Sequence, residues 1–251
     1  MRILASSALW LTLALTATVA AQDNTSLTRS EVAALKAKLV TVQTAMGADP
    51  PGYLKESEDF DLPTDFNPVN GGKFWPITSG ISLRYVDRAS TEGEANLEKA
   101  AEEFQVKYAA AAATGNVEQL TKMIEEMQRL QAAAITPAVK KENMNVYVQF
   151  NQNPTVGIDP DAVVLEQAGV IALRSKNGTD DRGDVTVYID PVALKATQEL
   201  SKIEFTTPDD GVSNKTGLYH IVIQLNGSVT DAEAWAKSFK FAPMLAVIDP
   251  R

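Results

Sequence analysis

Two amphipathic stretches separated by a helix stop occupy residues 91–135, and they constrain the fold more than any other feature of the sequence. In the first stretch, apolar residues recur every three or four positions: Leu97, Ala101, Phe104 and Tyr108. In the second, residues 117–134, the apolar spacing is close to the 3.5-residue repeat of coiled coils. Gly115 lies between them as a natural helix end. We therefore predict a long helical hairpin, with Thr91 and Glu94 opening its first helix.

A further helix is predicted near the start of the chain, over residues 29–46. Thr28 and Glu31 have the spacing of a capping box, and Gly47 follows as a C-terminal stop. The apolar residues of this segment form one stripe, which favours packing on the main domain. An arm for self-association or partner binding is the alternative. The region 22–47 is accordingly assigned as an N-terminal helical segment.

Residues 48–78 are rich in proline and glycine, which disfavours long regular elements. The segment also carries five aromatic residues, which is too apolar for a free linker: Tyr53, Phe60, Phe66, Phe74 and Trp75. We expect an irregular segment that lies across the folded body and buries these aromatics. A lid or a ligand-contacting strap is the functional alternative, since long loops in compact domains are often functional.

The remainder, 79–251, alternates strand patterns with helix patterns and contains the hairpin as an insertion. Strands are predicted at 80–86, 145–152, 170–174, 184–190, 203–206, 218–225 and 245–248, and helices at 160–167, 191–202 and 230–239. This order predicts an α+β fold, with antiparallel or mixed sheets and packed helices.

Two of the predicted strands alternate between an apolar face and a mainly polar face. One places Tyr147, Gln149 and Asn151 on a single face, and the other places His220, Val222, Gln224 and Asn226 together. Alternation of this kind is typical of a sheet with one face on the core and one polar face.

Similar segments recur along the chain and raise the hypothesis of an internal duplication. Residues 147–151 resemble 222–226, and 170–173 resemble 245–248, both at an offset of 75 residues. Residues 85–87 resemble 188–190 at an offset of 103 residues. If the repeats are real, a groove between them is the expected ligand-binding place. Its candidate lining residues are Gln149, Asn151, His220, Gln224 and Asn226.

The residues needed for common catalytic and metal sites are scarce. The sequence has one histidine and no cysteine, which excludes a cysteine nucleophile and the usual zinc ligand sets. Phosphate-binding glycine motifs are absent, and the acidic loop 177–184 lacks calcium-loop spacing. We expect no metal and no cofactor. A pair of carboxylates could still act as catalytic acid and base, and Asp87 and Asp190 are the candidates. The favoured role of both residues is capping of the following helix or turn.

The first 21 residues have the pattern of an export signal. Arg2 precedes an apolar run, and Val19 and Ala21 are small residues in the positions that precede a cleavage site, here before Gln22. An uncleaved membrane anchor is the alternative. Because disulfides are common in large secreted eukaryotic domains, a cysteine-free chain favours a bacterial periplasmic or secreted location.

The chain has a formal net charge of −9, which argues against nucleic acid as a partner. After cleavage we expect no membrane span and a soluble protein. The favoured function is a non-catalytic protein that binds a small ligand or a cell-envelope partner. One alternative is an envelope polysaccharide hydrolase or lyase with paired carboxylates. The other is an oligomeric structural protein that associates through 29–46 or 117–134.

Overall fold

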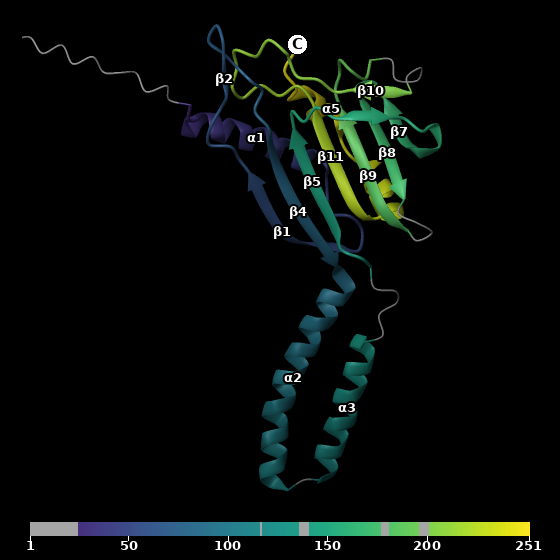
Figure 1. Ribbon diagram of the computed structural model, residues 1–251. Helices are drawn as coiled ribbons and strands as arrows, with labels where there is room; N and C mark the ends of the chain where they lie inside the picture. The colour runs from purple at the N-terminus through teal and green to yellow at the C-terminus, as the bar shows by residue number, and fades with distance from the viewer. Residues whose placement is uncertain (1–24, 116, 136–140, 177–180, 196–200) are drawn as a thin grey trace, which may run out of the picture.

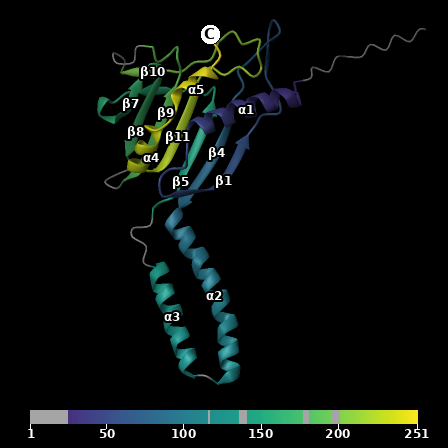
Figure 2. The same ribbon diagram turned by 180° about the vertical axis from the view of Figure 1, so that it is seen from behind.

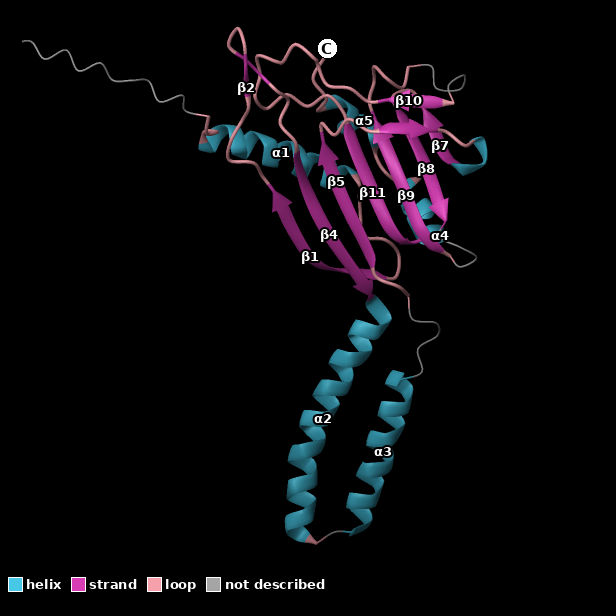
Figure 3. Cartoon of the chain, viewed as in Figure 1, coloured by secondary structure: helices cyan, strands magenta, loops and turns pink. Residues whose placement is uncertain are grey.

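The computed structural model contains one seven-stranded antiparallel sheet, helices on one of its faces, and a helical hairpin at one end (Figures 1 and 3). It describes residues 25–115, 117–135, 141–176, 181–195 and 201–251. In spatial order the strands are β1 (Tyr53–Asp61), β4 (Ser79–Asp87), β5 (Met144–Phe150), β11 (Ile221–Ser228), β9 (Arg182–Ile189), β8 (Val170–Lys176) and β7 (Val163–Gln167). The predicted α+β class is confirmed.

Two short ribbons accompany the large sheet. They pair β2 (Pro68–Val69) with β3 (Lys73–Phe74), and β6 (Thr155–Gly157) with β10 (Lys202–Glu204). A small second core lies under the β6–β10 ribbon and is built around Ile171, Leu194, Ile203 and Phe205. This core covers the β8–β9 half of one sheet face, which leaves the β1–β4–β5–β11 half of the same face open.

The main core lies between the other sheet face and three helices, α1 (Arg29–Ala45), α4 (Val229–Ala236) and α5 (Phe241–Ala246) (Figure 2). Alternate strand residues such as Val146, Val148 and Ile223 point into it and are fully buried. The helix α1 packs on this core through Leu39 and Val42, as the apolar stripe predicts. Its capping box forms as expected, with reciprocal bonds between Thr28 and Glu31.

The predicted hairpin is confirmed as α2 (Arg88–Thr114) and α3 (Val117–Ile135). Its first helix begins earlier than predicted, because Asp87 at the end of β4 is the N-cap in place of Thr91. The Asp87 carboxylate accepts hydrogen bonds from the backbone N–H and the hydroxyl of Ser90. Gly115 ends α2 in the left-handed conformation, at φ 67°, where a glycine carries no steric penalty.

The expectation of an irregular segment over residues 48–78 is wrong in part, because β1 lies within it. This strand is at the edge of the sheet, and most of its side chains are charged and exposed. Charged edge strands resist pairing with other chains, but they lack the apolar alternation by which strands are recognised. Of the aromatics expected to be buried, Tyr53 and Phe66 are, whereas Trp75 is 46% exposed.

Three further predictions of secondary structure are wrong. Residues predicted as the helix 160–167 form one 3₁₀ turn, η1 (Pro160–Ala162), followed by β7. Residues 191–195 form turns, held by the Asp190 carboxylate, and the rest of that predicted helix overlaps 196–200, outside the described residues. The predicted strand 245–248 overlaps the end of α5. A short apolar run fits a strand or a helix equally well, and packing of Met244 against the sheet selects the helix.

The strand order bears on the hypothesis of duplication. A three-stranded group, β1–β4–β5, and a four-stranded group, β7–β8–β9–β11, meet where β5 pairs with β11. The similar segments 147–151 and 222–226 thus lie on neighbouring central strands. The match of 170–173 with 245–248 is wrong, since it equates a strand with the end of a helix. Duplication stays a hypothesis, supported by strand order and not by that match.

Candidate functional site

The polar faces predicted for β5 and β11 lie on the open half of the sheet, which is drawn toward the viewer in Figure 1. Strand register arranges its side chains in three rows that cross the sheet from β1 to β8. The first row is Asp61, Gly80, Gln149, Val222, Tyr188 and Ile171; the second is Asp59, Ser82, Tyr147, Gln224, Thr186 and Leu173; the third is Ser57, Arg84, Asn145, Asn226, Asp184 and Ser175. We call the β1–β11 part of these rows the open face.

Three of the five predicted site residues lie on the open face. Gln149 is in the first row, Gln224 is in the second, and Asn226 is in the third. The side-chain amide of Asn226 donates a hydrogen bond to Asp184 on the neighbouring strand, at 2.7 Å. Gln149 and Gln224 are half-buried, so their amide groups reach solvent from the middle of the sheet.

Asn151 does not belong to this surface. The strand ends at Phe150, and Asn151 takes a left-handed conformation with φ 56°, which turns its side chain into the protein. Its amide nitrogen donates to the carbonyl oxygens of Ile77 and Gly217, both at 2.8 Å, and its oxygen accepts from the Tyr219 N–H at 2.9 Å. Asn151 therefore holds three segments together and is not available to a ligand.

His220 is also removed from the open face, because it precedes β11 and is fully buried. Its Nε2 atom contacts the carbonyl oxygen of Gln152, and Phe205 lies against the ring with centroids 6.0 Å apart. A carbonyl can only accept, so Nε2 carries the proton, while Nδ1 has no partner among the described residues. Burial lowers the pKa of His220, which keeps the imidazole neutral inside the protein.

The site residue that the sequence analysis left out is Tyr147. It lies in the centre of the open face, opposite Ser82 on one side and Gln224 on the other, and is 41% exposed. The alternation of its strand already places Tyr147 beside Gln149. The acidic flank of the surface, Asp59 and Asp61, was missed because β1 was not predicted as a strand.

Next to Tyr147 the open face is slightly hollowed. A depression of about 90 Å³ is lined by Asp61, Ser82, Tyr147, Gln149 and Gln152, among others. Gly80 forms part of its floor, and a Cβ atom there would come within 2.9 Å of the Val148 carbonyl oxygen. A side chain at this position would therefore clash with the neighbouring strand, which explains why glycine fits here.

A larger cleft, of about 440 Å³, lies where the open face meets the base of the hairpin. Its floor comes from β1 and β4, and its wall from the first turns of α2, through Ser90, Thr91 and Glu94. The charged floor residues Arg84 and Glu56 are paired at 2.8 Å. This volume lies in the range of ligand-binding clefts, although here the lining is mostly polar.

The carboxylate pair considered for catalysis is not brought together. Asp87 ends β4, whereas Asp190 follows Ile189, which is in register with Ser79 at the opposite end of β4. Eight residues of strand separate the two levels, or roughly 26 Å. Glycosidase carboxylates lie about 5–10 Å apart. Asp87 caps α2, and Asp190 is bonded to a turn and to Arg251, so both act structurally.

No group of metal-ligating side chains occurs among the described residues. The loop 177–184 falls partly outside them; within the described part, Asp181 accepts hydrogen bonds from the Ser228 and Thr230 hydroxyls. None of the helices in the described part of the chain has the length and apolar character of a membrane span. Comparisons with protein-family models, curated proteins and solved structures gave no significant match.

Proposed function

We propose that this chain is an exported, non-catalytic binding protein whose open face binds an uncharged glycan of the cell envelope. The observation that carries the proposal is the central position of Tyr147, exposed among the amides of Gln149 and Gln224. A flat aromatic ring covers the apolar face of a sugar, and amides beside it exchange hydrogen bonds with hydroxyl groups. The flat, strand-built floor suits an extended chain.

The composition of the open face favours a glycan over a protein partner. The buried centres of protein interfaces are enriched in aromatic residues, methionine and arginine and are depleted in aspartate and serine. The uncovered part of the open face has one large exposed aromatic, Tyr147, with Asp59, Asp61 and Ser82 beside it. The same carboxylates would repel an anionic polymer, which is why the proposed ligand is uncharged.

Export is part of the proposal and rests on the sequence pattern of residues 1–21, which lie outside the described residues. Expression of the full chain in a bacterial host, followed by fractionation and intact-mass measurement, tests it. We expect periplasmic or secreted protein that begins at Gln22. Protein that retains Met1 in the cytosol would contradict the export.

Glycan binding can be tested by electrophoresis in gels that contain soluble neutral polysaccharides, or by calorimetry with neutral oligosaccharides. The wild type should be retarded or give a binding isotherm, and Tyr147→Ala should bind at least tenfold more weakly. Tyr108→Ala is the matched control, because Tyr108 is 40% exposed but lies on the hairpin. Equal binding by wild type and Tyr147→Ala would remove the proposal.

The same samples test the absence of catalysis. After prolonged incubation with the protein, the bound oligosaccharide should keep its length, as measured by mass spectrometry. Shortened products that persist in Tyr147→Ala would indicate a hydrolytic or lytic site elsewhere in the chain.

A further inference from the structure

The hairpin makes little contact with the body from which it projects (Figures 1 and 2). Its two helices pack on each other, yet Ala111 is the single buried side chain among the hairpin residues whose burial is described. Large apolar side chains on it remain exposed, including Val106 at 73% and Val117 at 72%. Two helices alone cannot enclose a core, and apolar surface left in this way is typical of a binding surface.

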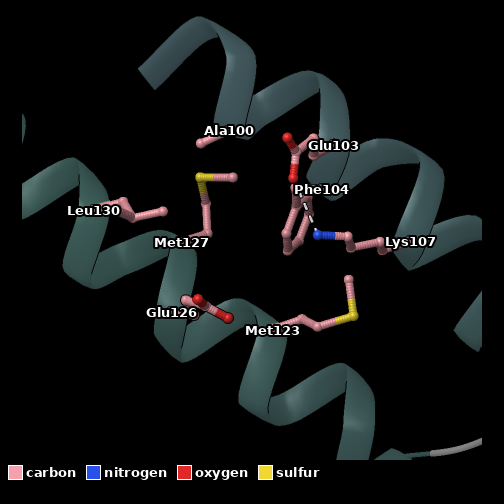
Figure 4. A pocket seen from close by; sticks show the side chains of 8 residues that line it. All are labelled: Ala100, Glu103, Phe104, Lys107, Met123, Glu126, Met127 and Leu130. Carbon is pink, nitrogen blue, oxygen red and sulfur yellow. Dashed lines mark hydrogen bonds and ion pairs between the residues drawn. The ribbon is translucent and has the colours of Figure 1, made fainter. Parts of the chain in front are cut away.

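One side of the hairpin is hollowed into an apolar groove between the two helices (Figure 4). The groove is lined by Ala100, Glu103, Phe104 and Lys107 from α2 and by Met123, Glu126, Met127 and Leu130 from α3. Figure 4 shows Met127 reaching from α3 toward Ala100 on α2, and Phe104 reaching from α2 toward α3. Methionine side chains adapt to a facing surface, so the groove can receive another helix.

The charges at the rim indicate which kind of helix would fit. Lys107 is paired with Glu103 at 3.1 Å on the α2 rim, and Glu126 lies on the α3 rim. A groove for a basic or an acidic helix would have a rim of the opposite sign alone. A rim with both signs is suited to meeting an identical rim, because a two-fold axis can bring Lys107 of one copy to a glutamate of the other.

We propose that two copies of this chain associate through this groove, hairpin on hairpin, to form an intermolecular four-helix bundle. Four helices are the arrangement in which each helix can turn its apolar stripe to a common core. The two bodies stay outside the bundle, and their open faces remain exposed. The association is independent of what the open face binds, and it would present two such faces in one particle.

The association can be measured by light scattering and sedimentation on the full chain over a wide range of concentrations. The wild type should be dimeric, and Met127→Glu should shift the dimerisation constant at least tenfold toward monomer, because it places a charge in the bundle core. Val106→Glu is the matched control: it adds the same charge to an apolar position on α2 outside the groove, and should leave the dimer intact. A wild type that is monomeric near millimolar concentration overturns the proposal.

The absence of cysteine from the chain allows a second measurement that leaves the groove largely intact. A bifunctional thiol reagent should link Leu130→Cys into covalent dimers at dilute concentration. Val192→Cys, on a loop of the body and 51% exposed, should not be linked covalently under the same conditions. If Met127→Glu loses helix content by circular dichroism, this cross-link decides the matter. Equal cross-linking of the two variants, or monomeric Val106→Glu protein, would overturn the proposal.

Discussion

Arg251 and Asp190 form an ion pair in which the carboxylate is completely buried. The guanidinium Nη2 lies 2.7 Å from Asp190 Oδ2 and also donates to the Tyr219 carbonyl oxygen. The other carboxylate oxygen accepts from the backbone N–H groups of Val192 and Ala193. One pair thus fixes the turn after β9 and the last residue of the chain against the start of β11.

Loss of Arg251 should destabilise the protein more than loss of a surface arginine. Arg251→Ala leaves a buried carboxylate without its cation, which costs about 3 kcal/mol in the free energy of unfolding. Arg174→Ala, which breaks a half-exposed pair with Glu233, should cost less than about 1 kcal/mol. Denaturant titration measures both. Adding Asp190→Asn to Arg251→Ala should restore part of the lost free energy of unfolding, because the uncompensated charge is removed. A double variant that is less stable than Arg251→Ala by a further ~3 kcal/mol would contradict this account.

Substitutions of Asn151 should separate backbone strain from lost hydrogen bonds. Asn151→Gly tolerates φ 56° but removes the three bonds to Ile77, Gly217 and Tyr219, which should cost roughly 2–4 kcal/mol. Asn151→Ala loses the same bonds and adds the left-handed strain of a Cβ, about 1 kcal/mol more. The order of melting temperatures should be wild type, then Gly, then Ala. Equal melting temperatures of Asn151→Gly and Asn151→Ala would show that the left-handed strain does not contribute.

His220 should make the fold sensitive to mild acid. Its pKa is lowered in the folded state by burial, so the unfolded state binds a proton first as the pH falls. The contribution of neutral His220 is fully present above the unfolded value of about 6.5 and is lost as the pH falls toward the folded value, at up to about 1.4 kcal/mol per pH unit.

The measurement is denaturant unfolding between pH 7.5 and about 5.5, a window in which most carboxylates stay ionised. Because His220 is the single histidine of the sequence, His220→Gln should be less stable than the wild type at pH 7.5 but should show a flatter pH dependence. An unchanged slope in the variant would refute the assignment to this residue.

Removal of the hairpin should leave the body folded. The end of β4 and the start of β5 are already neighbours, with Tyr85 in register with Met144, so a short glycine-containing turn can replace residues 91–135. Because the replaced residues contribute little to the main core, the free energy of unfolding should change by no more than about 1 kcal/mol. Thermal melts followed by Trp235 fluorescence measure this. A body that fails to fold would show that the hairpin is part of the core.

Two local helix signals were read correctly, whereas the Thr91–Glu94 signal was not, because Asp87 caps that helix instead. The Thr28–Glu31 capping box and the hairpin stop at Gly115 depend on residues within a turn of one another, so the sequence is sufficient. The alternation in β5 and β11 likewise placed Gln149 and Gln224 on the polar face, since side chains alternate in any strand. The edge strand β1 was not predicted. Most of its side chains are charged and exposed, so its sequence lacks the alternation of apolar and polar residues that marks a strand.

The sequence by itself determined the α+β class, the hairpin and the polar strand faces, because propensity, capping and periodicity act between neighbours along the chain. Tertiary structure alone decided that Asn151 and His220 turn inward, that Asp87 and Asp190 lie at opposite ends of the sheet, and that Tyr147 is central on the open face. These outcomes depend on strand order and on which face the helices cover. Both are set by burial of apolar surface summed over distant segments, which no local pattern records.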